Sequence, residues 1–167
     1  MSKEALLIAN RGEISIRIAR AAAALGMRTV AVYSEDDAHS LHVRRADDAV
    51  ALSGRGPRAY LDVEQIVEAA RNSGCSIIHP GYGFLSESAA FADAVRSAGL
   101  TLVAPRTDLL ALFGDKTQAR ALAQSLQVPV LRGTFAASTL DEIRAYYDSL
   151  PQGGSIVIKA SGGGGGR

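Results

Sequence analysis

The chain has 167 residues, of which 47% are hydrophobic, and its 18 basic and 17 acidic residues give a formal net charge of +1. This near balance excludes the broad positive field of proteins that bind nucleic acid or anionic membranes, and we expect neither as a partner. A single cysteine, Cys75, excludes an internal disulfide, and no apolar run approaches the roughly 20 residues of a membrane span. We therefore expect a cytoplasmic protein of one domain, or of one domain and part of a second.

The first 105 residues alternate short apolar runs with amphipathic helices. Strands are predicted at residues 5–9, 29–33, 49–52, 76–79 and 100–103. The spacing of apolar residues predicts helices over residues 13–25, between residues 62 and 74, and over residues 88–98. Because the helices that connect parallel strands cover both faces of a sheet, this alternation predicts a doubly wound, Rossmann-like α/β fold with a mainly parallel sheet.

The pattern changes after residue 105, where further helices are predicted at residues 108–113, from 115 to about 126, and from 139 to 150. Asp115 is the expected cap of the second, and Thr139 with Glu142 forms a capping box for the third. The apolar sides of these helices, including Leu126 and Tyr147, are expected to face a core. A buried strand is predicted at residues 156–158. We place the domain boundary near Gly114, which gives domains of residues 1–113 and 114–167.

The end of the chain combines the predicted last strand with Lys159, a run of glycines and Arg167. The glycines are Gly162, Gly163, Gly164, Gly165 and Gly166. Glycine lets backbone N–H groups approach anionic oxygens closely, and two cations would neutralise the charge of a phosphate. A glycine linker after a strand is the alternative interpretation. The strand and the cations together favour a phosphate-binding loop.

Residues 79–87, HPGYGFLSE, follow a predicted strand at its carboxyl end. Ligands of open α/β sheets bind at this edge, and the glycines around Tyr82, one of which is Gly83, permit a close approach of the backbone. A tight turn with a hydrogen-bonded His79 and a packed aromatic ring explains the same residues. The residues alone leave both interpretations open.

Lys116 follows Gly114 and Asp115 and falls in the first turn of a predicted helix. The helix dipole disfavours a cation there, but only by about 0.3–1 kcal/mol. A solvated lysine is therefore one interpretation, and a lysine whose missing partner is a bound anion is the other.

The first strand and the acidic cluster after the second strand invite a comparison with dinucleotide-binding proteins. The turn after the first strand, residues 10–13, carries one glycine, whereas the dinucleotide fingerprint requires G-x-G-x-x-G. This disfavours NAD or FAD as a cofactor. The acidic residues 35–37 are then expected to form a solvated loop rather than to bind a ribose.

Four motifs in the order IANRGEI, HPGYGFLSE, GDK and IKASGGGGGR resemble the biotin carboxylases, which are ATP-grasp enzymes. The resemblance implies a pre-ATP-grasp domain followed by the incomplete start of an ATP-grasp domain, cut off in the ATP lid. It implies that Lys116, Lys159 and the glycine run bind ATP, with a lid that is mobile without nucleotide and closes on it. Tyr82 and Gly83 would lie beside the biotin and bicarbonate site, while His79 and Glu87 would hold the turn together.

In this family, bicarbonate attacks the γ-phosphate of ATP, and the carboxyphosphate formed carboxylates biotin on a carrier. The resemblance therefore implies an ATP-dependent ligase that uses Mg²⁺, with a biotin carrier protein or domain and a carboxyltransferase component as partners. The metal ligands and the catalytic base are expected outside this chain, so the chain has no predicted catalytic residue and is expected to be inactive alone. The helix over residues 14–25 resembles one that packs across a dimer in bacterial members, which makes a homodimer a further expectation.

Two other interpretations remain open. Another ATP-grasp ligase, such as a relative of carbamoyl-phosphate synthase, would share the phosphate-binding lysines, although HPGYGFLSE argues against it. A docking or dimerisation module without catalysis is the third interpretation. The resemblance also leaves open the final carboxyl acceptor, which could be acetyl-CoA, propionyl-CoA, a longer acyl-CoA, pyruvate or urea.

Overall fold

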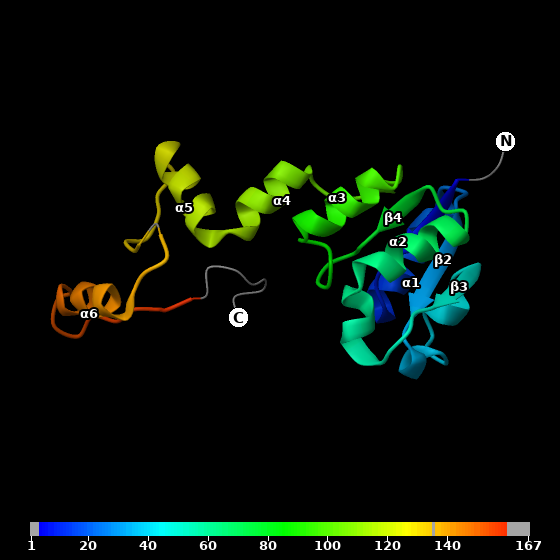
Figure 1. The fold of residues 1–167 in the computed structure, drawn as a ribbon, viewed down its shortest axis with the longest axis horizontal. Coiled ribbons are helices and arrows are strands. Elements are labelled where there is room, and N and C mark those ends of the chain that lie inside the picture. Colours follow the sequence, from blue (N-terminus) through cyan, green and yellow to red (C-terminus); the bar gives the residue numbers. More distant parts are fainter. Residues whose placement is uncertain (1–3, 135, 160–167) are drawn as a thin grey trace. The chain divides into compact units, whose positions relative to one another are not determined.

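The computed structural model describes residues 4–134 and 136–159, which belong to two compact units, Met1–Leu110 and Ala111–Arg167 (Figure 1). We call these unit 1 and unit 2. Every strand in the described part of the chain lies in unit 1. No helix among the described residues is long and apolar enough to cross a bilayer.

The sheet of unit 1 is parallel throughout, with the strand order β3-β2-β1-β4-β5. Its strands are β1 (Ala5–Ile8), β2 (Arg28–Tyr33), β3 (Asp48–Ala51), β4 (Ile77–His79) and β5 (Thr101–Leu102). The chain adds β2 and then β3 on one side of β1, and it then returns to add β4 and β5 on the other side of β1. The predicted α/β fold with a parallel sheet is therefore confirmed, and the strand order reverses between β1 and β4.

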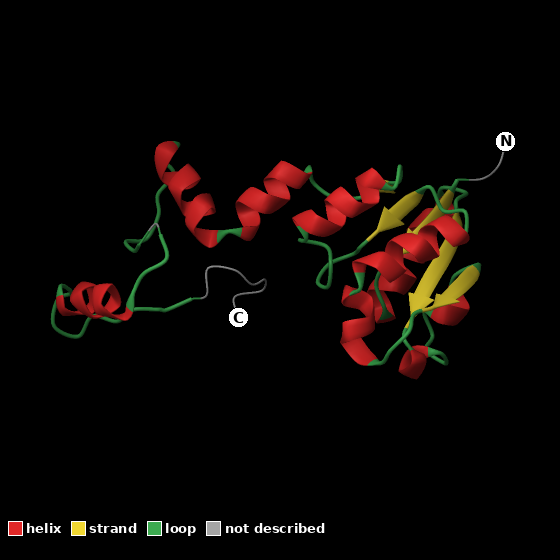
Figure 2. Cartoon of the chain, viewed as in Figure 1, coloured by secondary structure: helices red, strands yellow, loops and turns green. Residues whose placement is uncertain are grey.

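Helices cover both faces of this sheet, as expected for a doubly wound fold (Figure 2). On one face, α1 (Gly12–Ala24) packs Ile18 and Ala22 against Leu6 and Ile8 of β1. On the other face, α2 (Val63–Asn72) and α3 (Ala89–Ser97) pack against a cluster that includes Leu7. Alternate side chains of β1 pack on the two faces of the sheet because successive side chains of a strand point in opposite directions.

Three short 3-10 helices complete the described part of unit 1. They are η1 (Glu35–Asp37), η2 (Val43–Arg45) and η3 (Gly56–Leu61). The N-terminus of α2 is capped by Asp62, which accepts a hydrogen bond of 3.0 Å from the backbone N–H of Gln65. The side chain of Gln65 also donates to the Asp62 carboxylate, at 2.8 Å.

Unit 2 contains helices but has no buried residue among those the structure describes. The helix α4 (Thr107–Gly114) leads into it, and α5 (Lys116–Ser125) and α6 (Leu140–Asp148) follow. The predicted capping box of Thr139 and Glu142 is confirmed. The expectation of a core under these helices is wrong for this part of the chain, since Leu126 is 66% and Tyr147 52% exposed.

The strand predicted at residues 156–158 is also wrong. These residues have no regular secondary structure, and Val157 and Ile158 are 80% and 67% exposed. A strand needs a neighbour to satisfy its N–H and C=O groups. The described residues of unit 2 contain no other strand that could pair with this segment.

Replacing Ile66 with alanine should destabilise unit 1 by about 2–5 kcal/mol, because truncation of a buried aliphatic side chain leaves a cavity. Ile66 is fully buried, whereas Leu25 is 78% exposed and provides the matched control. Leu25→Ala should change the free energy of unfolding by less than about 0.5 kcal/mol. Urea unfolding of the chain, followed by circular dichroism, measures both changes, and equal effects would contradict the assigned core.

Candidate functional site

The candidate site lies where the carboxyl ends of β1 and β4 meet. Ile8 pairs with His79, and the N–H of Ala9 donates to the carbonyl of His79 at 2.9 Å. This is the point at which the strand order reverses, and in open α/β sheets the crevice at such a point is where ligands bind. The residues that follow the two strands therefore form the natural candidate site.

Asn10 joins the two strand ends. Its side chain is buried, and its amide nitrogen donates to the carbonyls of Pro80 at 2.7 Å and Tyr82 at 2.9 Å. Its amide oxygen accepts a hydrogen bond of 2.8 Å from the N–H of Arg11. One carboxamide thus fixes the loop after β4 to the turn after β1.

Gly81 lies against the start of α1 so closely that only glycine fits. Its φ is +66°, and a Cβ atom built there would lie 2.6 Å from Cγ2 of Ile14 and 2.7 Å from Nδ2 of Asn10. Gly83 has a similar φ of +69°, but no atom of the described residues lies within 4 Å of its virtual Cβ. The first glycine therefore permits close packing, whereas the second leaves open space beside the backbone.

Tyr82 stands between these glycines with its side chain 65% exposed. Its hydroxyl donates to Oε1 of Glu13 at 2.7 Å, and this hydrogen bond raises the pKa of the phenol. Phe84, two residues later, packs instead on the ring of Tyr60 at a centroid distance of 5.2 Å. The loop thus presents one aromatic side chain to solvent and directs the next into the core.

His79 supports the turn rather than facing a ligand. Its Nδ1 accepts a hydrogen bond of 3.0 Å from the N–H of Gly81, and burial lowers the pKa of the ring, which favours the neutral form. The predicted structural role of His79 is confirmed. Glu87, for which the same role was expected, is exposed, and no hydrogen bond joins its carboxylate to another described residue.

The acidic cluster after β2 is exposed at Glu35 and Asp36, as the sequence predicted, but not at Asp37. Asp37 is 6% exposed, and its carboxylate binds Arg11 through two contacts of 2.9 and 3.0 Å. Tyr60 donates to it at 2.8 Å and Ser40 at 2.9 Å. With these donors in place, the carboxylate has a structural role.

The protonation states in this cluster follow from its contacts. Burial alone would raise the pKa of Asp37, but hydrogen bonds from Tyr60 and Ser40 and the charge of Arg11 outweigh it and lower that pKa. Burial, together with the hydrogen bond to Asp37, raises the pKa of Tyr60 to about 12. The pair is therefore an ionised carboxylate and a neutral phenol across the physiological range.

His42 lies near this cluster and is almost completely buried. Its Nε2 is 3.2 Å from the carbonyl of Val32, and its Nδ1 has no hydrogen-bond partner among the described residues. Burial lowers the pKa of the ring more than the nearby Asp37 raises it. The fold therefore holds a neutral histidine.

Of the residues predicted to bind phosphate, Lys116 and Lys159 are described. Lys116 is the first residue of α5, after the cap Asp115, as the sequence predicted. The hydroxyl and N–H of Thr117 and the side chain and N–H of Gln118 lower the pKa of Asp115 to about 2. Lys159 is exposed in a segment without regular structure, and the glycines 162–166 lie outside the described residues. The convergence of these groups stays a prediction.

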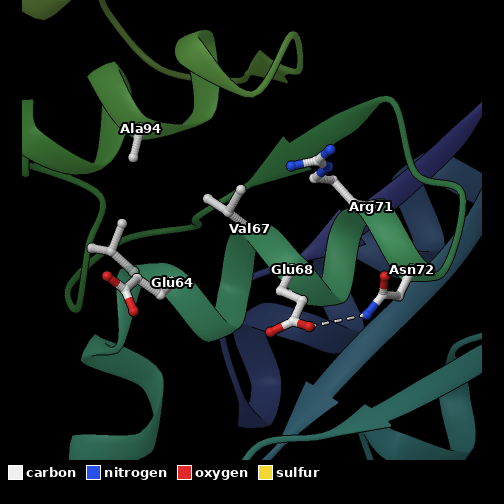
Figure 3. A pocket seen from close by; sticks show the side chains of 7 residues that line it. Glu64, Val67, Glu68, Arg71, Asn72 and Ala94 are labelled. Carbon is white, nitrogen blue, oxygen red and sulfur yellow. Dashed lines mark hydrogen bonds between the residues drawn. The ribbon is translucent and has the colours of Figure 1, made fainter.

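No group of three or more His, Cys, Asp or Glu side chains among the described residues could hold a metal ion. A hollow of about 520 Å³ lies on the outer side of α2 beside α3 (Figure 3). It is lined by Val63, Glu64, Val67, Glu68, Arg71, Asn72 and Ala94. None of the predicted site residues lines it, so we do not include it in the candidate site.

Comparison with known protein families agrees with this fold. Residues 2–110 match the model of the biotin carboxylase N-terminal domain. The chain belongs to this family. As a member of the biotin carboxylase family, it places the residues of its IANRGEI and HPGYGFLSE motifs in one hydrogen-bonded unit at the sheet edge.

Individual relatives extend the match over nearly the whole chain. It is 45% identical over 166 residues to the mitochondrial pyruvate carboxylase of Mus musculus, an alignment that covers 97% of this chain and 14% of that protein. The biotin carboxylase domain of a single-chain bacterial carboxylase is 56% identical, with a TM-score of 0.84 over 88% of this chain and 34% of that one.

A third relative is the biotin carboxylase domain dimer of the Hydrogenobacter thermophilus 2-oxoglutarate carboxylase, solved with MgADP, ADP and bicarbonate. It is 36% identical, with a TM-score of 0.92, and the match covers 98% of this chain and 36% of that one. The chain thus spans about one seventh of the curated relative and about a third of these two solved chains.

Sequence reasoning missed Asn10, Glu13 and the Arg11–Asp37 pair as parts of this edge. The signal that could have found Asn10 is a polar amide directly after a buried strand, at the end where ligands bind. Arg11 and Asp37 lie 26 residues apart, so no local pattern indicates their pairing.

Gly81→Ala should destabilise the fold more than Gly83→Ala. Both substitutions impose a left-handed backbone on alanine, at a cost of about 1–2 kcal/mol. Only the first also brings a Cβ into contact with Ile14 and Asn10, which adds about 1–3 kcal/mol of overpacking. Thermal unfolding of the two variants measures the difference, and equal losses would show that the close approach at Gly81 is absent.

His42→Gln should flatten the pH dependence of stability. Because the folded pKa of His42 lies below its ordinary value of about 6.5, the unfolded chain takes up the proton first, and stability is lost as the pH falls through that value. The slope from one proton is at most about 1.4 kcal/mol per pH unit. Urea unfolding between about pH 7.5 and 5 should show a smaller slope in the variant. An unchanged slope would contradict the buried neutral state.

Proposed function

We propose that this chain is the N-terminal part of a biotin-dependent carboxylase, and that the complete enzyme is an ATP-dependent ligase that carboxylates carrier-bound biotin with bicarbonate. The observation that carries the proposal is the match over 98% of the chain to a biotin carboxylase domain that was solved with MgADP and bicarbonate. The four ordered motifs of the sequence support the same activity. Residues 1–113 would form the pre-ATP-grasp domain, and residues 114–167 would begin the ATP-grasp domain.

Lys116 and Lys159, with Gly162 to Gly166, are the residues proposed to hold the ATP phosphates. At the start of α5, the Asp115 carboxylate already accepts the N–H groups of Thr117 and Gln118 at 2.8 and 3.2 Å. A phosphate near this helix would therefore be bound by the ammonium group of Lys116 rather than by these N–H groups. Phosphoryl transfer depends mainly on such positioning and charge neutralisation.

Tyr82 and Gly83 are proposed to lie beside biotin and bicarbonate. The exposed phenol and the open space beside Gly83 leave room for a small planar ring to contact both. The phenol is protonated near neutral pH and donates to Glu13, so its oxygen can still accept a hydrogen bond. His79 and Asn10 would support this loop through their hydrogen bonds to its backbone.

Mg²⁺ would neutralise the nucleotide phosphates, but no group of three or more His, Cys, Asp or Glu side chains among the described residues could hold it. The metal ligands and the catalytic base are proposed to lie elsewhere in the complete enzyme, so this chain alone would not turn over. A biotin carrier, a carboxyltransferase component and a second copy of the enzyme are the proposed partners. Because the relatives are named as pyruvate and 2-oxoglutarate carboxylases, the proposal is restricted to the shared carboxylation of biotin.

In the complete enzyme, Lys116→Ala and Lys159→Ala should each lower biotin-dependent ATP hydrolysis in the presence of bicarbonate about 10²-fold or more, because each removes a charge that neutralises the phosphates. Arg144→Ala is the matched control, since this cation of α6 is exposed and pairs, among the described residues, with Asp141 at 3.6 Å. Phosphate release measures the rates. Full activity in both lysine variants would refute the proposed ATP site, and activity that requires ammonia in place of bicarbonate would refute the proposed reaction.

A further inference from the structure

The position of the Tyr82–Gly83 loop depends on a residue outside it. Asn10 donates both of its amide hydrogens to this loop, one to the carbonyl of Pro80 and one to that of Tyr82. Asn10 is 3% exposed, and its bond to Pro80 is buried while its bond to Tyr82 is partly buried. Losing a buried donor leaves its carbonyl partner without compensation, which makes such bonds strongly orienting.

The other hydrogen bond that Tyr82 makes is weaker. The hydrogen bond from its hydroxyl to Glu13 lies at the surface, and the phenol itself is 65% exposed. Exposed polar contacts are readily replaced by water and are worth little. The bond to Glu13 can orient the ring, but it cannot fix the backbone from which the ring projects.

The close packing of Gly81 makes the geometry sensitive to Asn10. The virtual Cβ of Gly81 would lie 2.7 Å from Nδ2 of Asn10, the same atom that donates to the carbonyls on either side. The loop therefore folds around the carboxamide, which sets its distance from β1. A shift in the Asn10 side chain would be transmitted directly to Tyr82 and Gly83.

We propose that Asn10 is a positioning residue for biotin, which holds Tyr82 and Gly83 where the ring of the substrate binds. This inference rests on the proposed function. Asn10 does not touch the substrate, and it acts through the two carbonyls it binds. Its effect therefore falls on the part of the site proposed for biotin and bicarbonate and does not extend to ATP.

In the complete enzyme, Asn10→Ala should lower kcat/KM for free biotin at least tenfold, while the KM for ATP stays within twofold of the wild-type value. Ser15→Ala is the matched control, because Ser15 lies on α1, is also buried, and its hydroxyl has no hydrogen-bond partner in the part of the chain that the structure describes. Ser15→Ala should leave both parameters unchanged. A general loosening of the fold would instead alter the ATP and biotin parameters together, and that result would overturn the proposal.

Asn10→Asp gives a second test that keeps the size of the side chain. Its ionised form offers no donor to the two carbonyls, whereas its protonated form offers one. Burial between carbonyl oxygens raises the pKa of such a carboxyl group. The ratio of variant to wild-type kcat/KM for biotin should therefore increase as the pH is lowered from about 8 to 6. A ratio independent of pH would overturn the proposal, even if Asn10→Ala does not fold.

Failure of this inference can be distinguished from failure of the proposed function. A wild-type enzyme without biotin- and bicarbonate-dependent ATP hydrolysis refutes the proposed function, and the role of Asn10 falls with it. An active wild-type enzyme whose biotin parameters are unchanged in Asn10→Ala refutes only the role assigned to Asn10.

Discussion

The carboxamide of Asn10 donates hydrogen bonds to two backbone carbonyls at the point where the strand order reverses, between β1 and β4. After β1 the chain enters α1 on one face of the sheet, and after β4 it leaves through a loop on the way to α3 on the other face. The carbonyls of Pro80 and Tyr82 at this divergence accept no hydrogen bond from a neighbouring strand in the described part of the chain, and a carbonyl that leaves water without a donor is costly. Asn10 supplies both donors, and Gly81 provides the space that this requires.

Arg11, the residue after Asn10, connects the end of β1 to the segment that follows β2, on the other side of β1. Arg11 binds Asp37, which follows β2, and Asp37 in turn accepts from Tyr60 in η3. Two consecutive side chains thus tie the end of the central strand to elements that follow both of its neighbours, β4 and β2. The side chains of this turn are held mainly by partners far away in the sequence.

This explains which features the sequence predicts. The elements of unit 1 are predictable because local periodicity and burial agree, as in α3, where Phe91 and Val95 are fully buried. Caps such as Thr139 with Glu142 are predictable because all their atoms lie within one turn. The absence of a strand at residues 156–158 and the burial of Asp37 are not predictable, since both depend on partners that local patterns do not reveal. Asn10 was missed for the same reason, because its role appears only when β4 lies beside β1.

The proposed biotin part and the proposed phosphate part of the site therefore differ in how much of their geometry this chain provides. The edge with Asn10, Gly81 and Tyr82 rests on a sheet whose central strand is buried on both faces, and its geometry is complete within unit 1. Lys116 and Lys159 belong to unit 2, where no described residue is buried. Ordering a backbone costs about 1–2 kcal/mol per residue, and without a core little offsets that cost. Under the proposed function, the biotin side is preorganised by its own fold, while the phosphate side acquires its geometry from the rest of the enzyme and from the nucleotide.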